Sequence, residues 1–349
     1  MFKKIIILLF VALFLSGCGQ KIKTENTQGE KELNIYNWED YLGETTIADF
    51  EKEFGVKVNL FTFEDEDFML SDVQVNPDKY DLIIASDGLI YNMSELKLLS
   101  KINKNDIPNL KNIEDKFLNL WYDSENNYSV PYLWGTTGII FNTKYIPEDT
   151  DSWSILFNEQ YKGKIAMLNN NEEVIGAALK YLNYPFMAKS IEQLEEAKLI
   201  AEKQKDIISG YEDVVAIRSE MIDEKLWVAQ IYSGEALYAM NENKNLKYII
   251  PREGAEVWID NLAIPSEAKN KETAEKFINF ILRPDISADI ANYLWYANTN
   301  DAAREFTNAE ILEDEALYPP QDILEKLEYL KPNKFNNEYN KIWSQLQLK

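Results

Sequence analysis

The sequence predicts an α/β protein of two lobes, each built on a sheet with parallel βαβ units. The chain has 349 residues, beyond the size at which a single hydrophobic core keeps growing. Strand and helix patterns alternate over residues 33–84, an order typical of parallel sheets. The alternation starts again after residues 131–135, with no Gly/Ser linker between the halves. Two lobes joined by extended segments are therefore expected.

In the first half, apolar runs bounded by polar residues predict strands, and an amphipathic stretch predicts a helix. The helix over residues 44–53 places Ile47 and Phe50 on one face, and Gly55 follows as a stop signal. The strands expected in this half are residues 33–36, 56–61 and 80–84.

The second half carries the same kinds of element in a longer series, and Pro284 ends one of its helices. The expected strands are residues 138–141, 164–168, 226–232, 248–250 and 257–264. The expected helices are residues 172–182, 191–205, 271–282, 285–294, 320–327 and 338–346.

The N-terminus predicts export and lipid anchoring. Lys3 and Lys4 precede an apolar run over residues 5–14, which has the length of a signal-peptide core. Leu-Ser-Gly-Cys at 15–18 then resembles a bacterial lipobox, so we expect a signal peptide over 1–17 and lipidation of Cys18. An ordinary secretory signal with a chance cysteine is the alternative. Residues 18–31 are polar and aperiodic, which predicts a tether.

Composition excludes several classes of function. The net charge of −23, from 36 basic and 59 acidic residues, disfavours nucleic acid as a partner. The acidic excess suits a cationic ligand, but it equally serves solubility. The chain has no histidine and a single cysteine, Cys18, so Ser-His-Asp and Cys-His catalysis are excluded. We expect no catalytic residues, no resident metal and no cofactor.

Aromatic and carboxylate residues gather just after the predicted strands, where ligands of open α/β sheets bind. Carboxylates accept strong hydrogen bonds from ammonium groups, and aromatic faces attract cations and methylenes. The pattern thus suits an alkylammonium ligand. The candidate binding residues at these positions are Trp38, Glu39, Asp40, Ser86, Asp87, Asn170, Glu173, Tyr232, Trp258 and Asp260.

Each candidate also has a purely structural interpretation. Trp38 and Trp258 are compatible with ordinary core packing, and Asp40 with a helix cap. Glu173 opens a predicted helix, where the dipole favours acids. We interpret the acidic run 64–67 as a solvated face rather than a metal site. The pattern alone therefore leaves the ligand open.

Motifs along nearly the whole mature chain narrow the range of candidate ligands. The most specific segments are Tyr-Asn-Trp-Glu-Asp-Tyr at 36–41, and residues 80–86, 130–135, 258–265 and 277–285. With these segments the chain, from residue 33 to about 346, resembles the spermidine/putrescine-binding proteins of bacterial polyamine ABC transporters. The resemblance implies a type II periplasmic-binding-protein fold with a ligand cleft between the lobes.

The resemblance also implies how the chain divides. The crossovers are expected near residues 135–141 and 257–265. Lobe 1 would then comprise residues 32–135 plus about 259–305, and lobe 2 about 136–258 plus about 306–349.

By the same resemblance, Trp38 and Trp258 are the aromatic walls of the cleft. Tyr232 stands where the family often has Trp, and Tyr296 matches an aromatic near the end of the cleft. These residues would hold the methylene chain of the ligand.

The polar positions follow from the resemblance too. Asp260 would receive an amine and Glu173 a terminal amine, while Asp40 fills an acidic position and Ser86 a small polar one. The chain departs from spermidine-preferring members at Gly88, where they tend to carry an aromatic. It also departs at Asn170, where they tend to carry Asp, and at residues 329–330, where the Gln used by some members has no clear counterpart. Asp87 adds an acid that partly compensates.

We therefore expect a monomeric, extracytoplasmic, lipid-anchored protein that delivers spermidine, putrescine or both to ABC-transporter permease subunits. One alternative is a receptor for another small solute, such as a sugar, thiamine or ferric ion. Another is a glycan hydrolase that uses Glu173 and Asp260 as its carboxylate pair. A third is a ligand sensor that reports to a membrane receptor.

Overall fold

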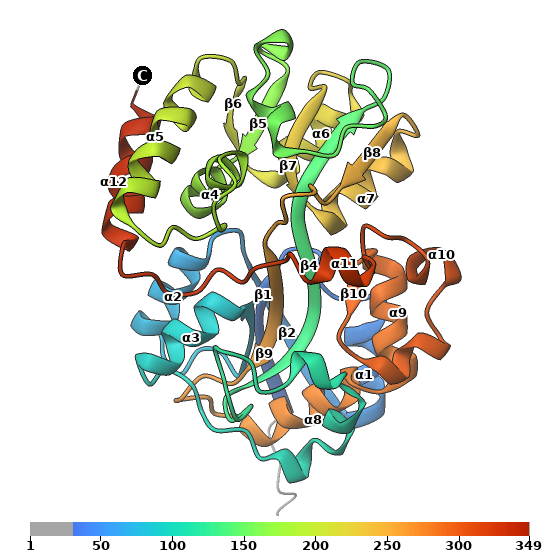
Figure 1. Cartoon of the computed structure of the whole chain (residues 1–349). Coiled ribbons are helices and arrows are strands. Elements are labelled where there is room, and N and C mark those ends of the chain that lie inside the picture. Colours follow the sequence, from blue (N-terminus) through green and yellow to red (C-terminus); the bar gives the residue numbers. More distant parts are fainter. Residues whose placement is uncertain (1–30, 349) are drawn as a thin grey trace, which may run out of the picture.

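A computed structural model describes residues 31–348 of the chain (Figure 1). The predicted signal peptide (1–17), the lipidation site Cys18 and the tether, apart from its last residue, lie outside the described residues. Within residues 31–348, no helix combines the length and apolar character needed to span a bilayer.

The first lobe is built on a sheet whose strands β2, β1 and β3 are parallel, with β9 antiparallel beside β3. The predicted βαβ order of this region is thereby confirmed. Its elements are β1 (Lys31–Trp38), α1 (Thr46–Phe54), β2 (Val56–Phe63), α2 (Glu66–Val75), β3 (Leu82–Ser86), α3 (Asp87–Glu95) and β9 (Val257–Ala263).

The long strand β4 (Ser129–Asn142) belongs to both lobes. Its first part pairs with β9 up to Thr136, and its last part pairs with β7 (Val228–Tyr232) from Thr137 onward. Figure 1 shows β4 running from the lower lobe into the upper one. Every residue of this strand is buried. The step from one sheet to the other therefore falls between two adjacent threonines.

The second lobe carries a sheet in the order β4, β7, β5, β6, with β8 also paired to β4. Its strands are β5 (Ile165–Leu168), β6 (Gly210–Glu212), β7 and β8 (Leu246–Ile249). Its helices are α4 (Asn171–Tyr181), α5 (Ile191–Lys205), α6 (Val214–Ile222), α7 (Ser233–Glu242) and α12 (Asn336–Gln347).

The remaining elements complete the first lobe and the connections. Strand β10 (Ala297–Asn298) pairs with β4, and the helices are α8 (Lys271–Ile281), α9 (Pro284–Leu294), α10 (Ala309–Leu312) and α11 (Gln321–Leu324). Short 3-10 turns span Lys104–Asp106, Pro108–Asn112, Asp115–Phe117, Trp153–Phe157, Glu159–Tyr161 and Asp301–Glu305.

Separate hydrophobic cores support the lobes. Phe50 and Phe277 anchor the first, and Trp153 and Phe186 lie in the second lobe. Successive side chains of a strand point to opposite faces of its sheet. The second sheet accordingly buries Ile139 on one face and Ile140 on the other. Each lobe therefore has a packed core of its own, and Leu237 of α7 reaches the core of the first lobe.

The burial of the C-terminal segments favours a last crossing between the lobes later than the boundary expected near residue 306. Ile311 and Leu317 are buried in the core of the first lobe, whereas Tyr339 of α12 is buried in the second. Leu327 packs against both cores. We therefore propose that the chain passes from lobe 1 to lobe 2 around residues 325–335.

Several predicted elements differ from those in the structure for identifiable reasons. The strand expected at 138–141 is only the end of β4, whose start is disguised by Pro131 and Gly135. Pro284 does not merely end α8; it opens α9, where its missing N–H costs nothing. Helices α6 and α7 were not predicted. In α6 the apolar residues are spread around the helix and form no single face, and the periodicity of α7 is weak.

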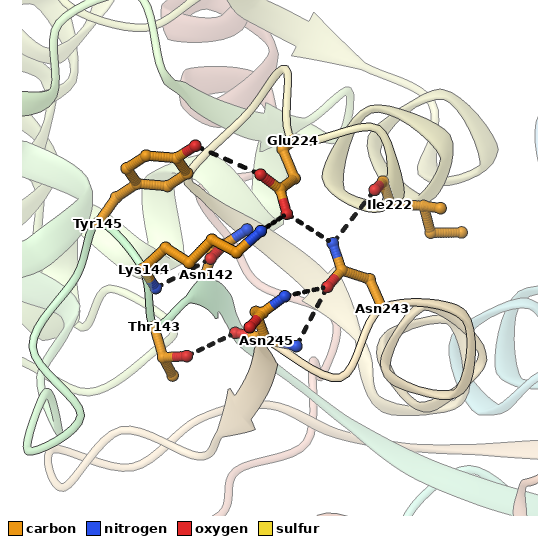
Figure 2. Close-up of polar contacts among 8 residues, drawn as sticks. All are labelled: Asn142, Thr143, Lys144, Tyr145, Ile222, Glu224, Asn243 and Asn245. Carbon is orange, nitrogen blue, oxygen red and sulfur yellow. Dashed lines mark hydrogen bonds and ion pairs between the residues drawn. The ribbon is translucent and has the colours of Figure 1, made fainter.

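A polar network ties the outer ends of β4, α6 and α7 together (Figure 2). The Lys144 ammonium pairs with the Glu224 carboxylate, which also accepts a hydrogen bond from the Tyr145 hydroxyl at 3.3 Å. Asn243 Nδ2 donates to the carbonyl oxygen of Ile222 at 3.2 Å. These contacts join segments on the second lobe alone.

Candidate functional site

The side chains of Trp258 and Asp260 share one face of β9, because alternate residues of a strand point the same way, and Glu256 lies in the same alternation immediately before the strand. In the sheet register Asp260 lies opposite Ser86 of β3, and Trp258 opposite Gly135 of β4. This face of β9 is the centre of the candidate site.

Asp260 is a buried carboxylate, 7% exposed. The Tyr41 hydroxyl donates to Asp260 Oδ2 at 2.6 Å. Burial raises the pKa of Asp260 to about 7. The hydrogen bond from Tyr41 lowers the pKa, whereas the charges of Glu66 and Glu256 raise it further. An ammonium group placed beside Asp260 would restore its ionised form.

Aromatic rings surround Asp260 and continue toward the second lobe. Tyr41 meets Tyr132 and Tyr296 edge to face, with ring centroids 5.9 and 5.3 Å apart. The ring centroid of Trp258 lies 5.9 Å from that of Tyr296 and 6.1 Å from that of Tyr232. Edge-to-face rings expose their electron-rich faces, which attract cations. The structure thus brings together three of the four predicted aromatic residues.

The close approach of the Trp258 ring requires glycine at position 135. A Cβ atom on Gly135 would overlap the Trp258 ring and would also meet Ser233 Oγ. We expect Gly135→Ala to displace the indole, lower the stability by about 1–3 kcal/mol and weaken ligand binding. Gly88→Ala is the matched control for stability, since its Cβ would meet only Ser86 Oγ, at 3.9 Å. Thermal melts of both variants and ligand titration of Gly135→Ala against wild type test this, and equal melting temperatures of the two variants would contradict it.

A pair of buried carboxylates lies where β4 changes sheets. Thr137 Oγ1 is 2.6 Å from Glu173 Oε1 and 2.9 Å from Glu256 Oε2. Gln230 Nε2 donates to Glu173 Oε2 at 3.0 Å. Burial raises the pKa of Glu173, and burial together with the Glu173 charge raises that of Glu256 well above its usual range.

Further acids approach from the first lobe. Glu66 accepts hydrogen bonds from the backbone N–H and hydroxyl of Ser86, at 2.8 and 2.7 Å. Asp87 is 5% exposed, and its Oδ2 has no hydrogen-bond partner among the described residues. Burial, followed by the charges of Glu256 and Asp260, raises the pKa of Asp87 well above its usual range.

None of these carboxylates has a basic partner in the part of the chain that the structure describes. The ion pairs there involve other acids. Buried charges are normally paired, so an unneutralised group of acids is a place for cations supplied from outside. The acids concerned are the half-buried Glu66 and the buried Asp87, Glu173, Glu256 and Asp260.

Three other predicted site residues, Trp38, Glu39 and Asp40, lie at the end of β1 or directly after it. Trp38 packs against Phe63 with ring centroids 4.4 Å apart, and its buried indole N–H has no partner among the described residues. Glu39 and Asp40 are exposed. Burial raises the pKa of Glu235, and the Asp40 charge adds to this shift. Asp40 does not cap α1.

Asn170 caps helix α4 with its side-chain oxygen. It accepts hydrogen bonds from the backbone N–H groups of Glu172 and Glu173, at 3.0 and 3.2 Å. The cap fixes the first turn of α4 and with it the backbone from which the Glu173 side chain extends. Asn170 therefore positions an acid of the cluster.

Sequence reasoning missed Glu66, Glu256 and Tyr41. The interpretation of the run 64–67 as a solvated face is wrong for Glu66, because that side chain turns inward to Ser86. Glu256 had a usable signal, since it immediately precedes the predicted strand 257–264 and stands two residues before Trp258 and four before Asp260.

The family of the chain follows from comparison with known proteins. Residues 45–319 match the family described as bacterial extracellular solute-binding protein, and the chain belongs to that family. The predicted resemblance and the two-lobed α/β fold are thereby confirmed. A family of solute-binding proteins favours capture over the glycan hydrolysis considered above.

Individual relatives carry more specific descriptions. The spermidine/putrescine-binding periplasmic protein of Salmonella typhimurium is 32% identical over 85% of this chain and 86% of its own length. The putrescine-binding periplasmic protein PotF of Escherichia coli is 30% identical over 91% of this chain and 92% of its own length. A crystal structure of the spermidine/putrescine ABC transporter substrate-binding protein PotD from Streptococcus pneumoniae superimposes with a TM-score of 0.83, at 32% identity, covering 91% of this chain and 98% of that one.

Proposed function

We propose that this protein captures polyamines, spermidine or putrescine or both, and delivers them to an ABC transporter. The observation that carries the proposal is the group of buried carboxylates without basic partners, bordered by aromatic rings. A linear polyamine has cationic nitrogens separated by methylenes, so it complements acids and aromatic faces in alternation. The names of the relatives support the same ligand class.

Within this proposal, Asp260 and Glu173 receive ammonium groups from the ligand. Trp258, Tyr232 and Tyr296 pack along its methylenes. The peripheral predicted residues, Trp38, Glu39 and Asp40, contribute from the first lobe, and Asp87 adds negative charge beside Ser86. The ligand neutralises acids that belong to both lobes, so it favours the arrangement in which the lobes are close.

Export and lipid anchoring at Cys18 complete the proposal. The names of the relatives include periplasmic proteins, and the sequence of residues 1–18 has the features of a lipoprotein signal. A bilayer-held receptor would act as a monomer and present the loaded cleft to the permease subunits. Metabolic labelling of Cys18 with a fatty acid, abolished by Cys18→Ser, tests the anchor.

Calorimetric titration of the protein without its signal peptide and tether tests which ligand it binds. We expect binding of spermidine or putrescine, weakened by added salt because the contacts are ionic. Cadaverine and spermine would measure the dependence on chain length and charge, while thiamine and a neutral sugar serve as controls. Absence of binding by every polyamine would overturn the proposed function.

A further inference from the structure

The contact of Thr137 with both Glu173 and Glu256 has a direct consequence for protonation. A threonine hydroxyl has one hydrogen to donate, and ionised carboxylates only accept. Thr137 Oγ1 lies within hydrogen-bond distance of Glu173 Oε1 and of Glu256 Oε2, at 2.6 and 2.9 Å. One of the two contacts therefore needs a proton supplied by a carboxyl group. Both side chains are buried, 1% and 6% exposed.

A second observation points from this pair to a ligand. Asp87, nine-tenths buried, has an unpartnered Oδ2, and Asp87 is close enough to Glu256 and Asp260 for their charges to raise its pKa. The side-chain oxygen of Gln230 is also buried without a partner among the described residues, while its amide nitrogen bonds Glu173. These buried oxygens accept hydrogen bonds but have no donor, and they lie beside a pair of acids. An ammonium group would supply the missing donors.

We propose that Glu173 and Glu256 share one proton in the unliganded protein and exchange it for an ammonium group of the bound amine. This inference rests on the proposed function and adds Glu256 as a ligand-binding residue. The alkylammonium enters with its charge, the shared proton leaves to the buffer, and both carboxylates become ionised around the cation. Charge within the pair is conserved in the exchange.

The groups that face the pair favour this exchange. The acid Glu172 and the phenols of Tyr232 and Tyr248 lie close enough to interact with the pair, and the ammonium of Lys180 is already paired with Glu328. No neighbouring cation among the described residues is therefore free to replace the proton. The titratable groups around the pair are Glu66, Asp87, Glu172, Tyr232, Tyr248 and Asp260.

Proton release on binding is the quantity that tests the exchange. Spermidine is titrated into the protein at pH 7 in phosphate and in Tris, whose ionisation enthalpies differ, so the difference in heat counts the protons released. We expect wild type to release about one proton more than Glu256→Gln, because the glutamine amide donates to Glu173 and leaves it ionised beforehand. We also expect Glu256→Gln to bind spermidine roughly tenfold more weakly at pH 8.

Controls separate this inference from the proposed function. Glu195→Gln, an exposed change on α5, should release as many protons as wild type. Thermal melts establish folding, and Glu173→Gln removes the same proton if Glu256→Gln does not fold. Equal proton release by wild type and Glu256→Gln, with spermidine bound by both, would overturn the exchange and leave the proposed function standing. No binding by wild type would instead overturn the proposed function.

Discussion

Asp260→Ala is expected to weaken polyamine binding by about 3–5 kcal/mol, or roughly two to four orders of magnitude in affinity. Asp260 is 7% exposed, lies on the crossover strand and is already held by the Tyr41 hydroxyl at 2.6 Å. An ammonium group desolvated beside this position has to be paired there. Removal of the carboxylate would leave a buried positive charge without its partner, which costs more than the loss of an exposed ion pair.

Asp260→Asn and Asp149→Ala make this prediction specific. Asn keeps the shape and the hydrogen bond to Tyr41 while removing the charge, so it should lose most of the affinity that Ala loses. Asp149 is exposed on the second lobe, and its replacement should leave binding unchanged. Calorimetry with spermidine and putrescine measures all three variants. Affinity of Asp260→Ala within threefold of wild type would show that Asp260 does not receive an amine.

The unliganded protein is expected to lose stability as the pH rises from about 5 to 8. Burial raises the pKa of Asp260 from 3.8 to about 7, so the folded state holds a proton that the unfolded state has released. Stability therefore falls with rising pH over this interval, since the folded state binds more protons. The pKa values of Glu256 and Asp87 are raised in the same direction. We expect the melting temperature to be ~5–10 °C lower at pH 8 than at pH 5.5.

Ligand and mutation should each flatten this dependence. Saturating spermidine supplies the cations that the acids lack, so its stabilising effect should be greater at pH 8 than at pH 5.5. Asp260→Asn removes one of the titrating groups and should raise the melting temperature of the unliganded protein at pH 8. Differential scanning calorimetry at both pH values measures these shifts. A melting temperature that rises with pH would contradict the assignment of protonated acids to the folded state.

The fold was predictable because its elements carry local signals. Helix α5 spans the expected residues 191–205, and β9 begins at the expected Val257. The cluster was only partly predictable, because its acids come from segments far apart in the chain. Asp260 and Glu173 follow or lie on strong strands, whereas the inward turn of Glu66 depends on its contact with Ser86, twenty residues away. Charge patterning along the sequence carries no information about that contact.

The passage of β4 between the sheets at Thr136 and Thr137 bears on how ligand preference can diverge among related receptors. Thr137 stands at the joint and also touches both acids of the pair, so a substitution there would change selectivity and lobe movement together. Gly88 has open space beside it and lies away from the joint. Among related proteins, substitutions that alter amine preference are therefore expected at positions such as Gly88, while position 137 is expected to vary little.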